Sequence, residues 1–139
     1  MREAGRPFVI VVDSNIVAYL YLPSDYTAHA EALLEREPEW AVPVLWRSEF
    51  RNILAGYLRR QTLTFDQACN LQIEAESLLA ETEYEVDSEA VLGLVRDSDC
   101  SAHDCEFIAL AVKLNTKLVT LDKKLLKAFP ERSVALTAG

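Results

Sequence analysis

The sequence predicts an α/β sandwich, in which helices cover both faces of a mostly parallel sheet. Phe8–Val12 is an unbroken apolar run dominated by β-branched residues, as is typical of a strand buried on both faces. Strand-like apolar runs alternate with helical patterns along the chain, and this alternation implies parallel strands joined by right-handed crossovers. The four glycines and five prolines are too few for the many tight turns of an all-β fold.

Length and composition predict one domain over residues 1–139. The chain is 50% hydrophobic and 26% charged, which is ordinary globular composition, and it has no repeat or Pro/Ser-rich linker. The apolar run that follows Arg2 and Arg6 ends at Asp13, so it is too short for a signal peptide. No run approaches the ~20 apolar residues of a membrane helix. We therefore expect a cytoplasmic protein with no membrane partner.

The first half of the chain after the first strand is predominantly helical in pattern. Pro23 ends the first helix and Pro43 closes a short apolar strand, since proline cannot continue either element regularly. Apolar residues at spacings of three and four indicate the third helix. We expect helices at about 14–22, 25–36 and 45–60, with a strand at 40–42.

The second half predicts further alternation of helices and strands. Thr64 is a favourable N-cap for a helix that runs to about Ala80, and Ser101 is a favourable N-cap for a later one. The helix opened by Ser101 carries a strongly apolar face. The remaining expected elements are a strand at 84–86, a helix at 88–95, a strand at 117–121, a short helix at 124–129 and an edge strand at 133–136.

Four acidic residues are predicted to gather at one rim of the sheet. Asp13 and Asp122 each directly follow a predicted strand, and the carboxyl ends of parallel strands are where ligands bind in such folds. Asp104 lies in the first turn of the helix opened by Ser101, on the face that carries its apolar residues. Glu49 lies near the start of the helix at 45–60.

Each acid also has a purely structural explanation. Asp13 and Asp122 could be helix N-caps, Asp104 stands at capping-box spacing from Ser101, and Glu49 could favour the positive end of a helix dipole. Carboxylates brought within about 4 Å of each other, however, repel by roughly 4 kcal/mol per pair, which protonation or a bound cation relieves. A set of oxygen ligands suits Mg²⁺ or Mn²⁺, ions that can activate water for phosphodiester hydrolysis.

Four segments together resemble a known family over nearly the whole chain. They are Val11-Val12-Asp13-Ser14-Asn15, Ser48-Glu49-Phe50-Arg51-Asn52, Ser101-Ala102-His103-Asp104-Cys105 and Leu118-Val119-Thr120-Leu121-Asp122-Lys123-Lys124-Leu125. In this order and spacing they resemble the PIN-domain nucleases, and VapC toxins in particular. The resemblance implies a five-stranded parallel sheet in a three-layer sandwich and metal-dependent cleavage of single-stranded RNA. It also implies a homodimer and a small VapB-like antitoxin as partner.

The resemblance assigns roles to seven residues. The catalytic and metal-binding acids would be Asp13, Glu49, Asp104 and Asp122, with Mg²⁺ or Mn²⁺ as cofactor. The supporting residues beside these acids would be Ser14, Asn15 and Thr120.

The sequence departs from the family pattern around the third acid. His103 and Cys105 stand where an aromatic and a small residue are more usual, and we expect them to alter the groove wall. Asp97 and Asp99 lie just upstream but lack the helical register of Asp104, so we expect them in a loop. Cys100 with His103 and Cys105 fits no standard zinc spacing, and reduced thiols are expected in a cytosolic protein.

The formal net charge of −8 argues against a nucleic-acid partner. Bound cations would offset part of it, and grouped basic residues could form local positive surfaces. These groups are Arg47, Arg51, Arg59 and Arg60, and then Lys113, Lys117, Lys123, Lys124 and Lys127.

Other functions are also compatible with parts of this pattern. The alternatives are a PIN-like binding module without catalysis and an RNA-processing nuclease with no toxin role. A phosphatase with Asp13 as nucleophile typically needs a second aspartate at position 15, which is Asn15. The chain has no GxxxxGK[ST] or GxGxxG motif that would cradle a nucleotide cofactor.

Overall fold

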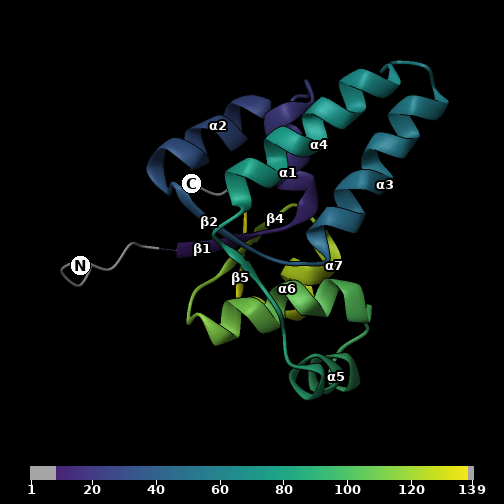
Figure 1. Ribbon diagram of the computed structural model, residues 1–139. Helices are drawn as coiled ribbons and strands as arrows, with labels where there is room; N and C mark the ends of the chain where they lie inside the picture. Colours follow the sequence, from purple (N-terminus) through teal and green to yellow (C-terminus); the bar gives the residue numbers. More distant parts are fainter. Residues whose placement is uncertain (1–8, 138–139) are drawn as a thin grey trace.

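The computed structural model describes residues 9–137 as a five-stranded sheet with helices on both faces (Figure 1). The predicted α/β sandwich with a parallel sheet is therefore confirmed. Arg2, Arg6 and Phe8, on which part of the sequence argument rested, lie outside the described residues. In chain order the elements are β1 (Val9–Val12), α1 (Ser14–Tyr21), α2 (Thr27–Arg36), β2 (Glu39–Pro43), α3 (Trp46–Arg59), α4 (Phe65–Leu79), β3 (Glu83–Tyr84), α5 (Ser88–Arg96), α6 (Ala102–Lys113), β4 (Leu118–Thr120), α7 (Lys123–Ala128) and β5 (Ser133–Ala135).

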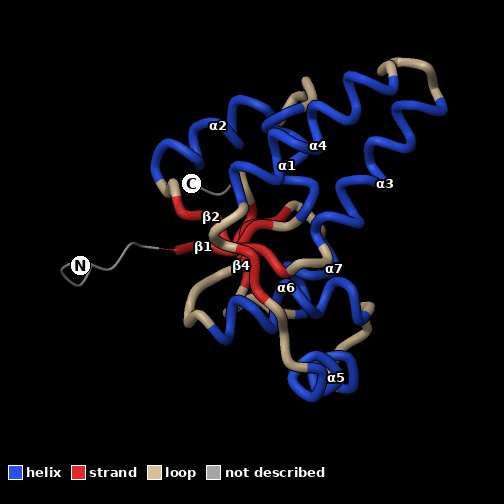
Figure 2. The backbone as a smooth tube through the Cα atoms, in the orientation of Figure 1, coloured by secondary structure: helices blue, strands red, loops and turns tan. Residues whose placement is uncertain are grey.

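The sheet has the order β3-β2-β1-β4-β5, and every pairing in it is parallel. Helices α1 to α4 lie on one side of the sheet, and α5 and α6 lie on the other (Figure 2). The chain therefore leaves β1 towards β2 on one side and returns to β4 on the other. The carboxyl ends of β1 and β4 form the point at which the strand order reverses, where ligands bind in open α/β sheets.

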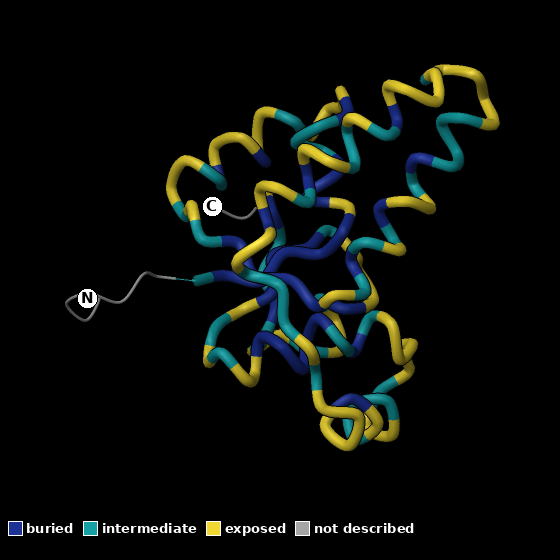
Figure 3. The backbone as a smooth tube through the Cα atoms, in the orientation of Figure 1, coloured by how far each residue is buried: buried dark blue, intermediate teal, exposed yellow. Residues whose placement is uncertain are grey.

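The core is centred on β1 and the helices that face it. Val11 and Val12 are fully buried, as the apolar run predicts. Trp46 and Phe50 of α3 and Phe107 of α6 are large side chains that are buried in the same core. Buried segments accordingly follow the sheet, whereas the far end of the α3–α4 pair extends away from it and is exposed (Figure 3). No helix among residues 9–137 is long and apolar enough to cross a membrane.

Side-chain caps fix where several helices begin. Thr64 and Gln67 form a reciprocal capping box at the start of α4, which confirms the predicted cap. The Ser101 hydroxyl accepts a hydrogen bond from the Asp104 N–H at 3.1 Å at the start of α6. Asp13 and Asp122 likewise cap α1 and α7. The two aspartates that follow strands are thus tied to helix starts by their own carboxylates.

Several strands differ from the expectation by one or two residues at their ends, since those expected at 40–42 and 133–136 are observed at Glu39–Pro43 and Ser133–Ala135. The strand predicted at 84–86 is observed at Glu83–Tyr84, because its partner strand β2 ends at Pro43, opposite Tyr84. The strand predicted at 117–121 ends at Thr120, so Asp122 does not directly follow it. The Thr120 hydroxyl accepts a hydrogen bond from the Asp122 N–H at 3.0 Å, and this turn separates strand from helix.

Candidate functional site

A cavity of about 420 Å³ opens beyond the carboxyl ends of β1 and β4. The starts of α1, α3, α6 and α7 surround it, and Ile53, Phe107 and Leu125 supply apolar parts of its wall. All four predicted acids line it. Its polar side chains are Asp13, Ser14, Asn15, Ser48, Glu49, Asn52, His103, Asp104 and Asp122.

Asp13 is the most buried acid of the cavity, with only 8% of its surface exposed. One carboxylate oxygen, Oδ1, accepts hydrogen bonds from the Asn15 N–H at 3.0 Å and the Ile16 N–H at 3.2 Å. The other, Oδ2, accepts one from the Thr120 hydroxyl, because the β1–β4 register brings these two strand ends together. Burial raises the pKa of Asp13 to about 6, against the opposing effect of these hydrogen bonds.

Glu49 approaches the cavity from the first turn of α3. The Ser14 hydroxyl donates a 2.7 Å hydrogen bond to Glu49 Oε1, which connects the start of α1 to the start of α3. Burial raises the pKa of Glu49, and the negative charge of Asp104 raises it further. The hydrogen bond from Ser14 favours the ionised carboxylate and opposes both effects.

Asp104 and Asp122 enter the cavity from α6 and α7. Burial raises the pKa of Asp104, and the charge of Asp122 adds to the shift. Asp122 Oδ1 caps α7 by accepting hydrogen bonds from the Lys124 N–H at 2.8 Å and the Leu125 N–H at 3.3 Å. Capping therefore engages Oδ1 in both Asp122 and Asp13. The capping role expected as an alternative is real, and it does not exclude a second role.

The four acids are electrostatically linked in a series across the cavity. Asp13 is coupled to Glu49, Glu49 to Asp104, and Asp104 to Asp122, each pair by repulsion that raises a pKa. Within residues 9–137, no three His, Cys, Asp or Glu side chains stand close enough together to hold a metal ion as they lie. The acids thus surround a shared space, and their oxygen chemistry fits Mg²⁺ or Mn²⁺ better than a softer metal.

The predicted supporting residues all contact this site. Ser14 and Thr120 donate hydroxyl hydrogen bonds to Glu49 and Asp13, and Asn15 both lines the cavity and binds Asp13 through its backbone N–H. Sequence reasoning did not single out Ser48 and Asn52, which line the cavity from α3. Their positions in the sequence could have indicated this. Ser48 lies one residue before Glu49 and Asn52 three residues after it, so all three residues lie on one side of the helix.

Other acids and thiols near the third segment lie away from the cavity. Asp97 is exposed and pairs with Arg96 through hydrogen bonds of 2.9 and 3.1 Å. Asp99 is exposed in the loop before Ser101 and does not line the cavity. Cys100 and Cys105 are free and buried, whereas His103 is exposed on the cavity wall. These two cysteines and the histidine form no metal-binding group among the described residues.

The basic residues that were expected to form local positive surfaces are only partly free to do so. Arg47 donates to both carboxylate oxygens of Glu83, at 2.6 and 2.7 Å, and to Glu76 at 3.1 Å. Its charge is therefore neutralised within the fold, and the inclusion of Arg47 in a positive surface was wrong. Lys113 donates to the backbone carbonyl of Glu85 at 3.4 Å, a contact that positions its side chain without neutralising its charge.

Comparison with known proteins agrees with this geometry. The family model of the PIN domain matches residues 10–130. The chain is 31% identical over 125 residues to Ribonuclease VapC3 of Pyrobaculum aerophilum, an alignment that covers 87% of this chain and 95% of that protein.

Solved structures share the fold at lower identity. PAE2754 from Pyrobaculum aerophilum superimposes with a TM-score of 0.73 at 19% identity, covering 91% of this chain and 83% of that one. A toxin-antitoxin complex from Klebsiella pneumoniae contains a chain with a TM-score of 0.67 at 16% identity, covering 91% and 97%. The family match over most of the chain and the shared fold lead to one conclusion. This chain belongs to the PIN domain family.

Proposed function

We propose that this protein is an endoribonuclease that hydrolyses RNA phosphodiester bonds with Mg²⁺ or Mn²⁺. The observation that carries the proposal is the convergence of four carboxylates, from four different elements, on one cavity at the strand-order reversal. The similarity to Ribonuclease VapC3 supports RNA as the substrate class. The mutual repulsion of the acids gives a physical reason for a cation to bind there.

The acids Asp13, Glu49, Asp104 and Asp122 would hold the ion. A divalent cation bound there supplies a water of lowered pKa and positive charge opposite the phosphate oxygens. Thr120 and Ser14 hold Asp13 and Glu49 in fixed orientations, so these two ligands need little reorganisation when the ion binds. Asn15 presents an exposed side chain at the same opening and is a candidate contact to the substrate.

The biological role that we propose is that of a toxin. Its activity would be restrained by a VapB-like antitoxin, and the protein would act as a homodimer. Support comes from the VapC3 relative and from the fold shared with the toxin-antitoxin complex of Klebsiella pneumoniae. Induced expression should arrest growth of a bacterial host, and an Asp104→Asn variant produced to the same level should not.

The first experiment is cleavage of total RNA by the purified protein. Mn²⁺ or Mg²⁺ should produce discrete fragments, and EDTA or Asp104→Asn should abolish them. Asp99→Asn is the matched control, because it makes the same chemical change at an exposed position outside the cavity. Absence of cleavage with either metal, from folded protein free of antitoxin, would favour a binding module instead.

A further inference from the structure

Arg51 does not itself line the cavity that carries the four acids, but it contacts a residue that does. It projects from α3, the helix that also contributes Ser48, Glu49 and Asn52 to the cavity. Its guanidinium Nη2 donates a 3.1 Å hydrogen bond to the Ser48 hydroxyl. The charged end of Arg51 is thereby held against a residue that lines the cavity, although Arg51 itself is exposed.

The charge of Arg51 is not neutralised by the described part of the protein. Ion pairs within residues 9–137 engage Arg47 and Arg96, and none engages Arg51. A guanidinium has five N–H donors in a planar fork, and the contact with Ser48 uses one. The remaining donors are free to bind an oxyanion at the cavity edge.

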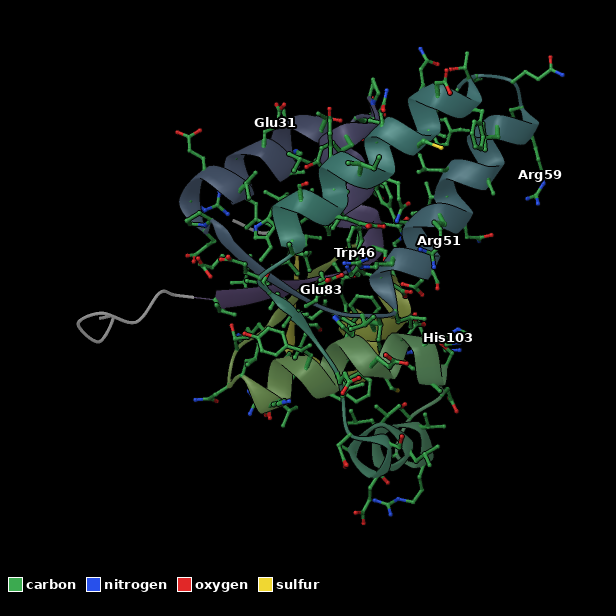
Figure 4. All side chains as sticks on the ribbon, in the orientation of Figure 1. Glu31, Trp46, Arg51, Arg59, Glu83 and His103 are labelled. Atoms are coloured by element: carbon green, nitrogen blue, oxygen red, sulfur yellow. The ribbon has the colours of Figure 1, made fainter. Side chains whose placement is uncertain are left out.

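The opposite wall of the cavity is formed by α6. His103 is exposed there and lines the same cavity. Arg51 and His103 lie on the same side of the molecule, one on each of these two helices (Figure 4). Arg51 and His103 thus lie on two helices that both contribute walls to the cavity.

We propose that Arg51 is a substrate-binding residue that holds an RNA phosphate next to the one that is cut, in a position set by Ser48. This inference rests on the proposed nuclease function. A protein with a net charge of −8 repels RNA at long range, so a local, unpaired cation is needed beside an acidic cavity. Arginine suits this role because its planar fork can make two parallel hydrogen bonds to one phosphate.

Arg59 provides a matched control on the same helix. It is exposed and lies eight residues beyond Arg51, about 12 Å farther along α3 and away from the cavity. Arg51→Ala and Arg59→Ala remove the same charge from the same helix. The two positions differ in their distance from the cavity, in the contact with Ser48 and by about 80° around the helix axis.

The test measures binding of a fluorescein-labelled single-stranded RNA by fluorescence anisotropy in EDTA, together with steady-state cleavage in Mn²⁺. Arg51→Ala should weaken binding about tenfold, the size expected for one charged hydrogen-bonding contact. It should also reduce the slope of log K against log salt by about 0.7, as for one lost phosphate contact on a single strand. Cleavage should show a raised KM with a smaller change in kcat.

Two further variants separate charge from geometry. Arg51→Lys keeps the charge without the fork and should bind with intermediate affinity. Ser48→Ala keeps Arg51 but frees its guanidinium, and should weaken binding about two- to threefold, by ~0.5 kcal/mol. Arg59→Ala should stay within about twofold of the wild type.

Two results would overturn the inference. Equal weakening by Arg51→Ala and Arg59→Ala, with wild-type cleavage intact, would show that α3 contributes only diffuse charge and would leave the nuclease proposal standing. Wild-type protein that neither binds nor cleaves RNA would remove both proposals together.

Discussion

Two opposing effects act on the pKa of Asp13: burial raises it and three hydrogen bonds to the carboxylate lower it. Burial has the larger effect. The pKa of Asp13 in the folded protein is raised to about 6, from an ordinary value of 3.8. An acid with a raised folded pKa destabilises the fold once it ionises. This contribution is absent below pH 3.8, grows as the pH rises and is complete above pH 6. The rise of the Asp13 pKa from 3.8 to about 6 corresponds to roughly 3 kcal/mol of lost stability at neutral pH.

This pKa shift predicts a stability change that depends on pH. In EDTA, Asp13→Asn should become more stable relative to the wild type as the pH rises from about 4 to about 7, by up to roughly 3 kcal/mol. Urea unfolding at both pH values measures the difference, with Asp99→Asn as the exposed control. Parallel stability curves for wild type and Asp13→Asn would mean that Asp13 is not desolvated in solution.

The Thr120 hydroxyl helps to position the acids of the site. The hydroxyl is fully buried, donates to Asp13 and accepts from the Asp122 N–H, so one atom positions two of the acids. Thr120→Val keeps the shape and should reduce stability by about 1–3 kcal/mol, because it leaves the Asp122 N–H and a buried Asp13 oxygen without the hydroxyl as partner. It should also reduce kcat about tenfold.

The conservative variant distinguishes this role from simple packing. Thr120→Ser keeps the hydroxyl and loses one methyl group, so it should retain most of the wild-type kcat while losing some stability. Urea unfolding and cleavage assays on both variants check these outcomes. Equal losses of kcat in Thr120→Val and Thr120→Ser would assign the effect to packing.

At the scale of elements, α3 is anchored to β3 by a partly buried polar network. Glu83 accepts from Arg47 and also from the Trp46 indole N–H at 2.6 Å, and the Arg47 contact lowers the pKa of Glu83. Trp46 and Glu83 lie next to each other beside the start of α3 (Figure 4). Glu49 follows in that same turn. The network therefore sets where one acid of the site stands.

Removing the Glu83 charge should affect both stability and activity. Glu83→Gln should reduce the free energy of unfolding by about 1–3 kcal/mol, because two strong donors lose a charged acceptor. It should also reduce kcat/KM, since the start of α3 can shift. Asp97→Asn breaks the Arg96–Asp97 pair, whose side chains are 77% and 61% exposed, and should change stability by less than about 0.5 kcal/mol. Equal effects of the two variants would contradict an anchoring role.

The distance in sequence between contacting residues explains which features could be predicted from the sequence and which could not. The elements followed from local signals, such as the apolar run of β1 and the capping box at Thr64. The pairing of Arg47 with Glu83 joins residues 36 apart in the chain, and no local pattern distinguishes such an arginine from a free one. The hydrogen bond from Thr120 to Asp13 joins residues 107 apart. The family resemblance indicated Thr120 as a supporting residue, and nothing in the sequence indicated which acid it contacts.

The acids of the site were placed at one rim because parallel topology relates strand ends over any distance in sequence. The same rule could not predict how closely the carboxylates approach, which depends on helix starts and side-chain rotamers. Asp122 shows this limit, since it stands two residues beyond β4 as the cap of α7.

For the whole molecule, the site joins parts of the chain that are far apart. Asp13 belongs to the start of α1, Glu49 to α3, Asp104 to α6 and Asp122 to α7. An ion held by these residues would connect the first and last helices and relieve their mutual repulsion. Because the four acids come together only in the fold, the ion should bind the folded state far better than the unfolded chain.

Metal addition should therefore stabilise the fold in a concentration-dependent way. Ligand present at 100 times its Kd adds about 2.7 kcal/mol, so Tm should rise steadily with Mn²⁺ or Mg²⁺. Asp104→Asn should flatten this rise, and Asp99→Asn should retain it. KCl at matched ionic strength is the control for charge screening. Screening of the net charge of −8 by any salt stabilises an acidic protein. If KCl raised Tm as much as Mn²⁺ did, the acids would be acting through their summed charge, and no ion would be held by the four residues together.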